Sequence, residues 1–186
     1  NLRFLMNKSK YFILPIFLYL LSGTARAVDI NIAITGAIYV PPCVVNNNIP
    51  IQFSFNQIMT YKVDGQTSAI TKNIPITCTY FKGSPYVKVS GIQLAGAPDN
   101  VLKVSADSVN SNRFGLALYQ GESVDENNPL RLNGSAPRGY AITKGFSNTG
   151  QDRSQFTITA VPFKTGTADL SPGNFTASAS LSIVYN

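Results

Sequence analysis

Histidine and tryptophan are both absent from this sequence, and each absence removes a class of function. Without histidine the chain lacks the most common general base and the most common metal-binding side chain. The glycine patterns of a hydrolase nucleophile elbow and of a phosphate-binding loop are also missing. We therefore expect no catalytic residue, no metal site and no cofactor in this protein.

Two other functions need consideration: catalysis by a pair of acidic residues, and carbohydrate binding by exposed tyrosines. Asp107, Glu122, Asp125 and Glu126 could form a pair of carboxylates, although we expect them to be solvated charges in loops. A secreted carbohydrate-binding module would need exposed aromatic rings, and the missing tryptophan takes away one ring that stacks on sugars. The candidate tyrosines for such a site are Tyr61, Tyr80, Tyr86, Tyr119 and Tyr140.

Charged residues are few, and they form no cluster. Four of the 15 lysines and arginines lie in the first 27 positions, which hold no acidic residue. The rest of the chain has 11 basic against 9 acidic residues, so the formal charge of +6 comes mainly from the N-terminal segment. The remaining basic residues are scattered, which argues against a nucleic-acid-binding surface.

Long hydrophobic runs are nearly absent as well. The run over residues 11–21 is too short to span a membrane, and no second run follows it. Three basic residues precede this run, and Ala25-Arg26-Ala27 provides small residues where signal peptidase cleaves. We expect residues 1–27 to be a signal peptide whose translation could begin at Met6, and the mature chain to begin at Val28 without a membrane span.

The two cysteines, Cys43 and Cys78, both lie in the part expected to be exported. Exported proteins meet an oxidising compartment, so we expect a disulfide between them. Such a bridge stabilises the fold by ~3 to ~4.7 kcal/mol in the chain-entropy model. Two buried free thiols are the alternative, and neither cysteine has the partner spacing of a metal site.

Apolar and polar residues alternate with a period of two through most of the mature chain, and helical periodicity is nearly absent. Short strands separated by turn residues predict one all-β sandwich domain. The expected strands include residues 49–55, 74–78, 86–90, 114–119 and 156–161.

The N-terminal stretch of the mature chain is unusually apolar on one side. Ile30, Ile32, Ile34 and Gly36 would all project to the same side of a strand. Chain ends usually fray and tolerate polar residues, so this stripe needs a surface that covers it. An ordinary first strand of the sandwich would also explain the pattern.

The C-terminal stretch alternates in the same way, and its second face is largely serine and threonine. It could be a plain edge strand or a strand with a special role. The apolar face comprises Phe175, Ala177, Ala179, Leu181, Ile183 and Tyr185.

Taken in order, several motifs resemble the subunits of chaperone–usher pili, and most closely the minor subunits of the pilus tip. Gly173, fourteenth from the end, and the penultimate Tyr185 resemble the family's chaperone-recognition motif. The further motifs are the N-terminal alternation with Gly36, Tyr39-Val40-Pro41-Pro42-Cys43, Val45-Asn46-Asn47, Cys78-Thr79-Tyr80, the stretch 114–121 and the stretch 156–163.

The resemblance implies an incomplete immunoglobulin-like sandwich that lacks its seventh strand. A periplasmic chaperone would fill the gap against residues 173–186, with the carboxylate of Asn186 held by basic chaperone residues. An outer-membrane usher would then export the subunit. In the fibre, residues 28–38 would be a donor strand for a neighbouring pilin or the tip adhesin, and residues 39–186 the pilin domain. We expect a structural minor pilin that acts as a tip adaptor and links the adhesin to the tip fibre; a rod subunit, a terminator and a carbohydrate-binding adhesin module are the alternatives.

Overall fold

The computed structural model describes residues 29–107 and 109–186. The expected signal peptide lies outside the described residues. Contacts divide the chain into a unit that ends at Ala37 and a unit from Ile38 to Asn186. Within the described ranges there is no α-helix, only the 3-10 turns η2 (Asn46–Asn48) and η3 (Thr60–Lys62), and no helix long and apolar enough to cross a membrane.

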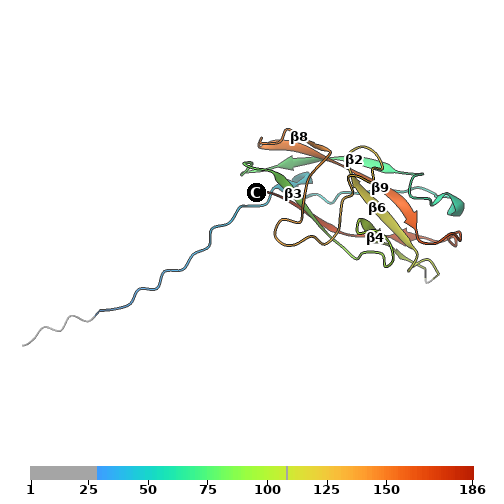
Figure 1. Ribbon diagram of the computed structural model, residues 1–186, viewed down its shortest axis with the longest axis horizontal. Helices are drawn as coiled ribbons and strands as arrows, with labels where there is room; N and C mark the ends of the chain where they lie inside the picture. The colour runs from blue at the N-terminus through green and yellow to red at the C-terminus, as the bar shows by residue number, and fades with distance from the viewer. Residues whose placement is uncertain (1–28, 108) are drawn as a thin grey trace, which may run out of the picture. The chain divides into compact units, whose positions relative to one another are not determined.

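The unit from Ile38 onward is built around an antiparallel sheet that contains the longest strands (Figure 1). Its order is β1-β2-β9-β6-β4, and β8 adds to β9. The strands are β1 (Val44–Val45), β2 (Ile70–Thr77), β9 (Arg153–Lys164), β6 (Phe114–Gln120), β4 (Val101–Lys103) and β8 (Phe146–Ser147).

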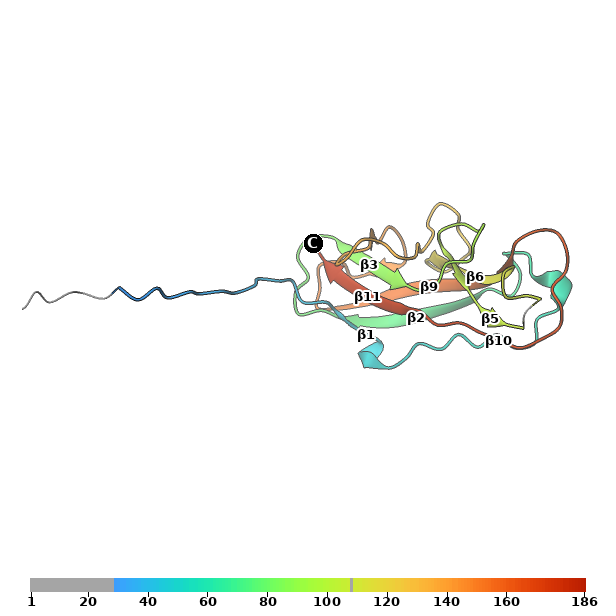
Figure 2. The same ribbon diagram turned by 90° about the horizontal axis from the view of Figure 1, so that it is seen from below.

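The second layer consists of β11, β3 and β7, and a separate short pair joins β10 to β5 (Figure 2). In this layer β11 pairs with β3 along its whole length. The bounds are β11 (Ser180–Tyr185), β3 (Pro85–Ser90), β7 (Tyr140–Ala141), β10 (Phe175–Thr176) and β5 (Ser105–Ala106).

The two layers meet through the alternation seen in the sequence. Along β3, every second side chain is buried, and the others are half-exposed. Ile74 and Ile76 of β2 and Phe156 of β9 pack with Val87 of β3 and Ile183 of β11 in one core cluster. Because strand side chains alternate between faces, this packing makes a two-layer sandwich and confirms the expected all-β, immunoglobulin-like fold.

The expected disulfide is confirmed. Cys43 and Cys78 are bonded and nearly buried, and the described residues contain no free cysteine. Cys43 also donates its backbone N–H to the carbonyl of Ile183 in the second layer, at 2.8 Å. The chain is therefore fixed to both layers at Cys43, immediately before β1.

Candidate functional site

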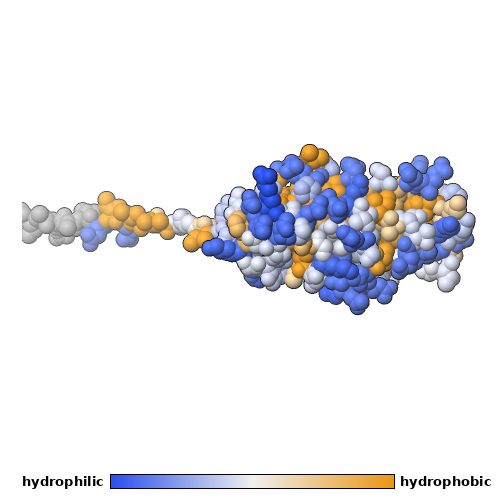
Figure 3. Space-filling view, turned by 90° about the horizontal axis from the view of Figure 1, so that it is seen from above, coloured by the Kyte–Doolittle hydropathy of each residue, from blue (hydrophilic) through white to orange (hydrophobic). Residues whose placement is uncertain are grey.

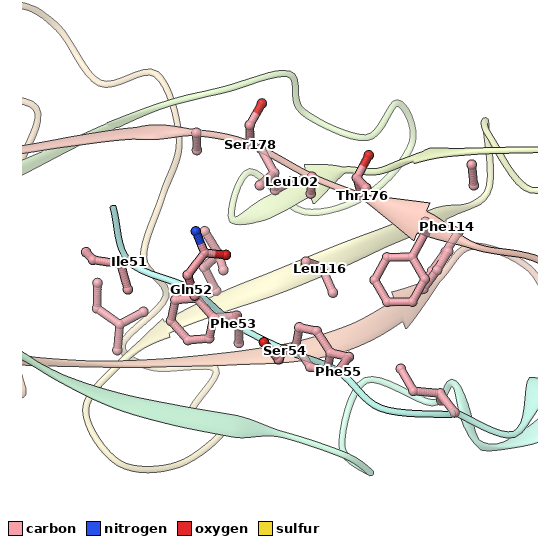
Figure 4. Close-up of a pocket in the computed structure, with 18 of the residues that line it drawn as sticks. Ile51, Gln52, Phe53, Ser54, Phe55, Leu102, Phe114, Leu116, Thr176 and Ser178 are labelled. Atoms are coloured by element: carbon pink, nitrogen blue, oxygen red, sulfur yellow. The ribbon is translucent and has the colours of Figure 1, made fainter. Parts of the chain in front are cut away.

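A large apolar groove lies beside the C-terminal strand. Its volume is about 1840 Å³. One rim is the segment 49–59, which we call the strap, and the opposite rim is the C-terminal segment 170–182. Figure 4 shows Phe53 and Phe55 on the strap, with Leu116 of β6 between the two rims. The floor includes Val89, Leu102, Leu116, Leu118, Ile158 and Ala160.

The strap corrects one expectation from the sequence, because residues 49–55 do not form a strand. Within the part of the chain that the structure describes, no backbone–backbone hydrogen bond reaches residues 50–58. The side chains nevertheless alternate as predicted, since Ile51, Phe53 and Phe55 are half-buried while the residues between them are exposed. The pattern of a strand is present, and the partner strand is missing.

An asparagine turn leads from β1 into the strap. Asn46, Asn47 and Asn48 have φ angles of 47°, 52° and 62°, in the left-handed region that asparagine tolerates better than most residues. The side-chain amide of Asn46 donates to the carbonyl of Ile49 at 2.8 Å, and the Ile49 N–H donates to the carbonyl of Asn46 at 2.8 Å. This turn sends the chain along the edge of the groove.

The C-terminal segment forms the other rim and then enters the core. It is not one continuous strand as expected, because β10 pairs with β5, β11 pairs with β3, and residues 177–179 have no strand partner. Thr176 and Ser178 point away from the strap in Figure 4. Of the residues expected in the chaperone-binding strand, Gly173, Phe175, Ala177, Ala179 and Leu181 line the groove, whereas Ile183 and Tyr185 are fully buried in the core.

The last two residues are held by the domain itself. The Tyr185 hydroxyl accepts a hydrogen bond from the Gly150 N–H at 3.1 Å. Asn186 is exposed, and its backbone exchanges two hydrogen bonds of 3.0 Å with the backbone of Ser84. The Tyr185 side chain is thus placed in the core, away from the groove.

The two ends of the groove differ. At one end Phe55 of the strap and Phe175 of the opposite rim lie 6.2 Å apart between ring centroids, and Phe114 meets Phe175 edge-on at 4.7 Å. At the other end, Pro42 and Cys43 line the groove where Cys43 bonds to Ile183. Between these ends, small side chains such as Ala177 and Ala179 leave room for an inserted chain.

The groove carries no charge, because none of its lining residues is acidic or basic. Within the described ranges no buried polar side-chain atom lacks a hydrogen-bond partner, and no group of acidic residues and cysteines could hold a metal. Such a surface can take up an apolar, uncharged chain, whereas burying a charge there is costly. A segment with alternating apolar side chains and free backbone groups fits both the floor and the rims.

The N-terminal unit is described over residues 29–37, and it contains no strand. Ile30, Ile32 and Ile34 are 80%, 83% and 90% exposed, and a Cβ added at Gly36 would meet no atom within 4 Å. Figure 3 shows hydrophobic side chains along this unit. The isoleucine stripe is therefore exposed in the isolated chain.

Asp125, one of the acidic residues considered above as a catalytic carboxylate, is engaged in hydrogen bonds with its neighbours. Lys144, Asn128 and the backbone of Asn127 donate hydrogen bonds to Asp125 and lower its pKa from 3.8 to about 2, so Asp125 stays ionised at neutral pH. Such a carboxylate is a poor general base or acid.

The tyrosines do not form one open platform. Tyr119 is buried, Tyr86 lies under Arg138, and Tyr140 lies under Arg131. Tyr61 and Tyr80 keep exposed rings.

Sequence reasoning identified the rims of the groove better than its floor. The alternation around Phe53 and Phe55 marked the strap, although as a paired strand. Leu102 and Leu116 gave no comparable signal, because a strand pattern does not say which buried side chains lie under an uncovered part of the sandwich.

The comparisons with known proteins agree with this geometry. A family model described as fimbrial protein matches residues 32–186. The fimbrial adapter PapF and the minor fimbrial protein PrsF, both of Escherichia coli, are each 39% identical over 167 residues, which cover 90% of this chain and 94% of each relative.

Two solved structures are also similar. One is of the P pilus adaptor subunit PapF, with a TM-score of 0.54, 35% identity, and coverage of 80% of this chain and 98% of that one. The other is the P pilus rod subunit PapA, with a TM-score of 0.51, 16% identity, and coverage of 84% and 100%, which shows the fold alone. The chain belongs to the fimbrial protein family.

Proposed function

We propose that this chain is a structural adaptor subunit of a chaperone–usher fimbria, joined to its neighbours by giving one β-strand and receiving another. The observation that carries the proposal is the uncharged groove between the strap and the C-terminal rim, whose facing backbone groups are largely unpaired. An added strand would gain affinity from main-chain hydrogen bonds and specificity from alternate side chains. This role needs no catalytic group.

The giving half of the joint is the N-terminal stretch. Ile30, Ile32 and Ile34 are exposed and share one side, so they can enter the groove of a neighbouring pilin. Burying one isoleucine side chain contributes ~1.5 to ~3 kcal/mol. Gly36 has no Cβ, which lets the strand pass a narrow point of the recipient.

The receiving half explains the need for a chaperone. An uncovered apolar groove with free strand edges is an aggregation hazard. A periplasmic chaperone that lends a strand would protect it until an outer-membrane usher passes the subunit to the fibre at the cell surface. The free edge from Phe175 to Leu181 offers the pairing partner for that strand, whereas the buried Tyr185 side chain supports the rim from within.

The adaptor role, rather than that of rod subunit or terminator, is supported by the similarity to PapF, whose name is fimbrial adapter. An adaptor needs both halves of the joint. We propose that residues 30–36 enter the pilin domain of the tip adhesin, while the groove receives the extension of the next tip subunit.

Two charged double variants of the extension test strand donation. Ile32→Asp with Ile34→Asp places charges on the side that enters an uncharged groove, and it should abolish the joint while leaving chaperone binding intact. The matched control, Ala33→Asp with Thr35→Asp, charges the opposite side of the same strand and should retain the joint. Co-purification with the adhesin measures the result, and equal loss in both variants would contradict side-specific insertion.

Deleting the subunit tests the adaptor role separately. Without it, surface display of the adhesin and adherence should fall more than the amount of rod protein, measured by quantitative mass spectrometry of isolated fimbriae. Normal adhesin display in the deletion strain would exclude the adaptor role and leave the general pilin assignment standing.

A further inference from the structure

The short stretch between the isoleucine stripe and the disulfide has the sequence Tyr39-Val40-Pro41-Pro42, and we call it the spacer. It ends at Cys43, which is fixed by the disulfide and by the hydrogen bond to Ile183. Pro42 and Cys43 also line one end of the groove. The spacer therefore joins the strand that the chain is proposed to donate directly to the end of its own groove.

This arrangement poses a problem, because a chain could fill its own groove. A short flexible linker gives a tethered segment an effective concentration in the millimolar range, well above that of a neighbouring subunit in solution. Self-insertion would hide the stripe and block the groove, and both halves of the joint would be lost.

Self-insertion requires the chain to reverse direction within the spacer. After Cys43 the chain runs through β1 and the strap along the groove edge, away from the end at Ile183 (Figure 2). Residues 30–36 could enter the same groove only by running back toward that end and then turning sharply before Cys43. Four residues are enough for such a reversal, and loops of this length are most often built around a type I turn.

The two prolines oppose that turn. A type I turn needs a ψ of about −30° at its first central residue and about 0° at its second, and a residue before proline is pushed away from both values, to a ψ of about +120° to +160°. Val40 precedes Pro41, and Pro41 precedes Pro42, so every placement of the turn within the spacer puts one of them in the disfavoured region. Consecutive prolines instead favour an extended conformation that acts as a semi-rigid spacer.

We propose that the Pro41-Pro42 spacer prevents the extension from entering its own groove and so keeps both available to neighbouring subunits. This inference rests on the proposed exchange of strands, and it adds a feature of the chain that directs the exchange to neighbouring subunits. Tyr39 and Val40 are 77% and 38% exposed, and the spacer contains no turn. The device acts through backbone conformation alone.

The test replaces the spacer prolines in the full mature chain with the most turn-prone pair, Pro41→Asn with Pro42→Gly. Refolded by dilution without chaperone, the variant should give about tenfold more soluble monomer than the unmodified chain, with amides of residues 30–36 protected from hydrogen exchange. The control is Pro98→Gly, at an exposed position in a turn. The backbone carbonyl of residue 98, which accepts a hydrogen bond from the Val101 N–H, is kept in this variant, so it should behave like the unmodified chain.

Adding Ile32→Asp and Ile34→Asp to the turn-prone variant should remove its gain in soluble monomer. An unmodified chain that already refolds as a monomer with protected residues 30–36 would overturn the inference, as would a turn-prone variant that behaves like the control. A different result would show that the proposed strand exchange itself is wrong. In that case Ile32→Asp with Ile34→Asp, in a chain with the natural spacer, would still join its neighbours normally.

Discussion

At the scale of single residues, Tyr185 shows how a family motif can act through the core. The resemblance assigns this residue to chaperone recognition, but its side chain is fully buried and its ring lies 6.3 Å from that of Phe146. Its hydroxyl accepts a hydrogen bond from Gly150. A substitution at this position therefore disturbs the packing of the second layer of the sandwich, and it affects the groove only through that packing.

Tyr185→Phe should cost about 1 kcal/mol of unfolding free energy, because it removes the hydrogen bond that the Gly150 N–H donates to the Tyr185 hydroxyl. Tyr185→Ala should cost about 3 to 5 kcal/mol, because it leaves a large cavity. Denaturant unfolding with the groove filled by a donor peptide measures both. Full stability of Tyr185→Phe together with lost chaperone capture would show a direct contact instead.

Asp64 gives the loop after η3 a dependence on pH. Its carboxylate accepts hydrogen bonds from the N–H of Thr67, the Thr67 hydroxyl and the N–H of Gln66, and these bonds lower its pKa from 3.8 to about 2. A lowered pKa in the folded state means that the ionised form supports the loop above the ordinary pKa. That support is lost as the pH falls through about 2.

The amide resonances of Gln66 and Thr67 should therefore titrate with a midpoint near pH 2, rather than near the ordinary 3.8. Thr67→Val, which removes the hydroxyl donor, should move the midpoint upward, and Asp64→Asn should abolish it. The measurement is an NMR titration of the groove-filled protein. A midpoint at the ordinary value in the unmodified chain would show that these bonds do not persist in solution.

At the scale of elements, the strap has the alternating side chains of a strand but no partner to pair with among the described residues. When a donor fills the groove, residues 50–58 gain a neighbour with free backbone groups, so their amide exchange should slow by about tenfold or more. Hydrogen exchange followed by mass spectrometry measures this change. The amides of β3, which pairs with β11 along its whole length, serve as the internal reference. A strap that exchanges equally fast in both states would exclude pairing.

The sequence predicted the paired elements well and the unpaired ones less well. Alternation placed β3 and β6 within one residue of their observed bounds and found the centre of β9, whereas β2 begins four residues earlier than expected. β9 runs longer than expected because both β2 and β6 extend it. The aromatic end of the groove was not predictable, since Phe55, Phe114 and Phe175 are brought together only by the folded sandwich.

At the scale of the whole molecule, the disulfide compensates for the incomplete core. It closes a stretch of 35 residues that includes the strap, where residues 50–58 have no backbone–backbone hydrogen bond to the described part of the chain. In the chain-entropy model, closing this loop lowers the conformational entropy of the unfolded chain and so raises the unfolding free energy of the domain.

Replacing both cysteines, Cys43→Ser with Cys78→Ser, should lower the unfolding free energy by ~3 to ~4.7 kcal/mol. Denaturant unfolding of the groove-filled protein measures the loss, and reduction of the unmodified protein should reproduce it. A thiol assay on the native protein should find none reactive. Two reactive thiols would show that the bond does not form in the cell.

The double attachment of Cys43 also determines how a fibre of such subunits bears a pulling force. Tension that arrives through the spacer meets the disulfide to Cys78, beside β2, and the hydrogen bond to Ile183 on β11. The load is divided between the two layers at their common edge. Because the disulfide carries part of this force directly to the end of β2, the two-residue β1 and the strap beyond it are not the first parts to be peeled away.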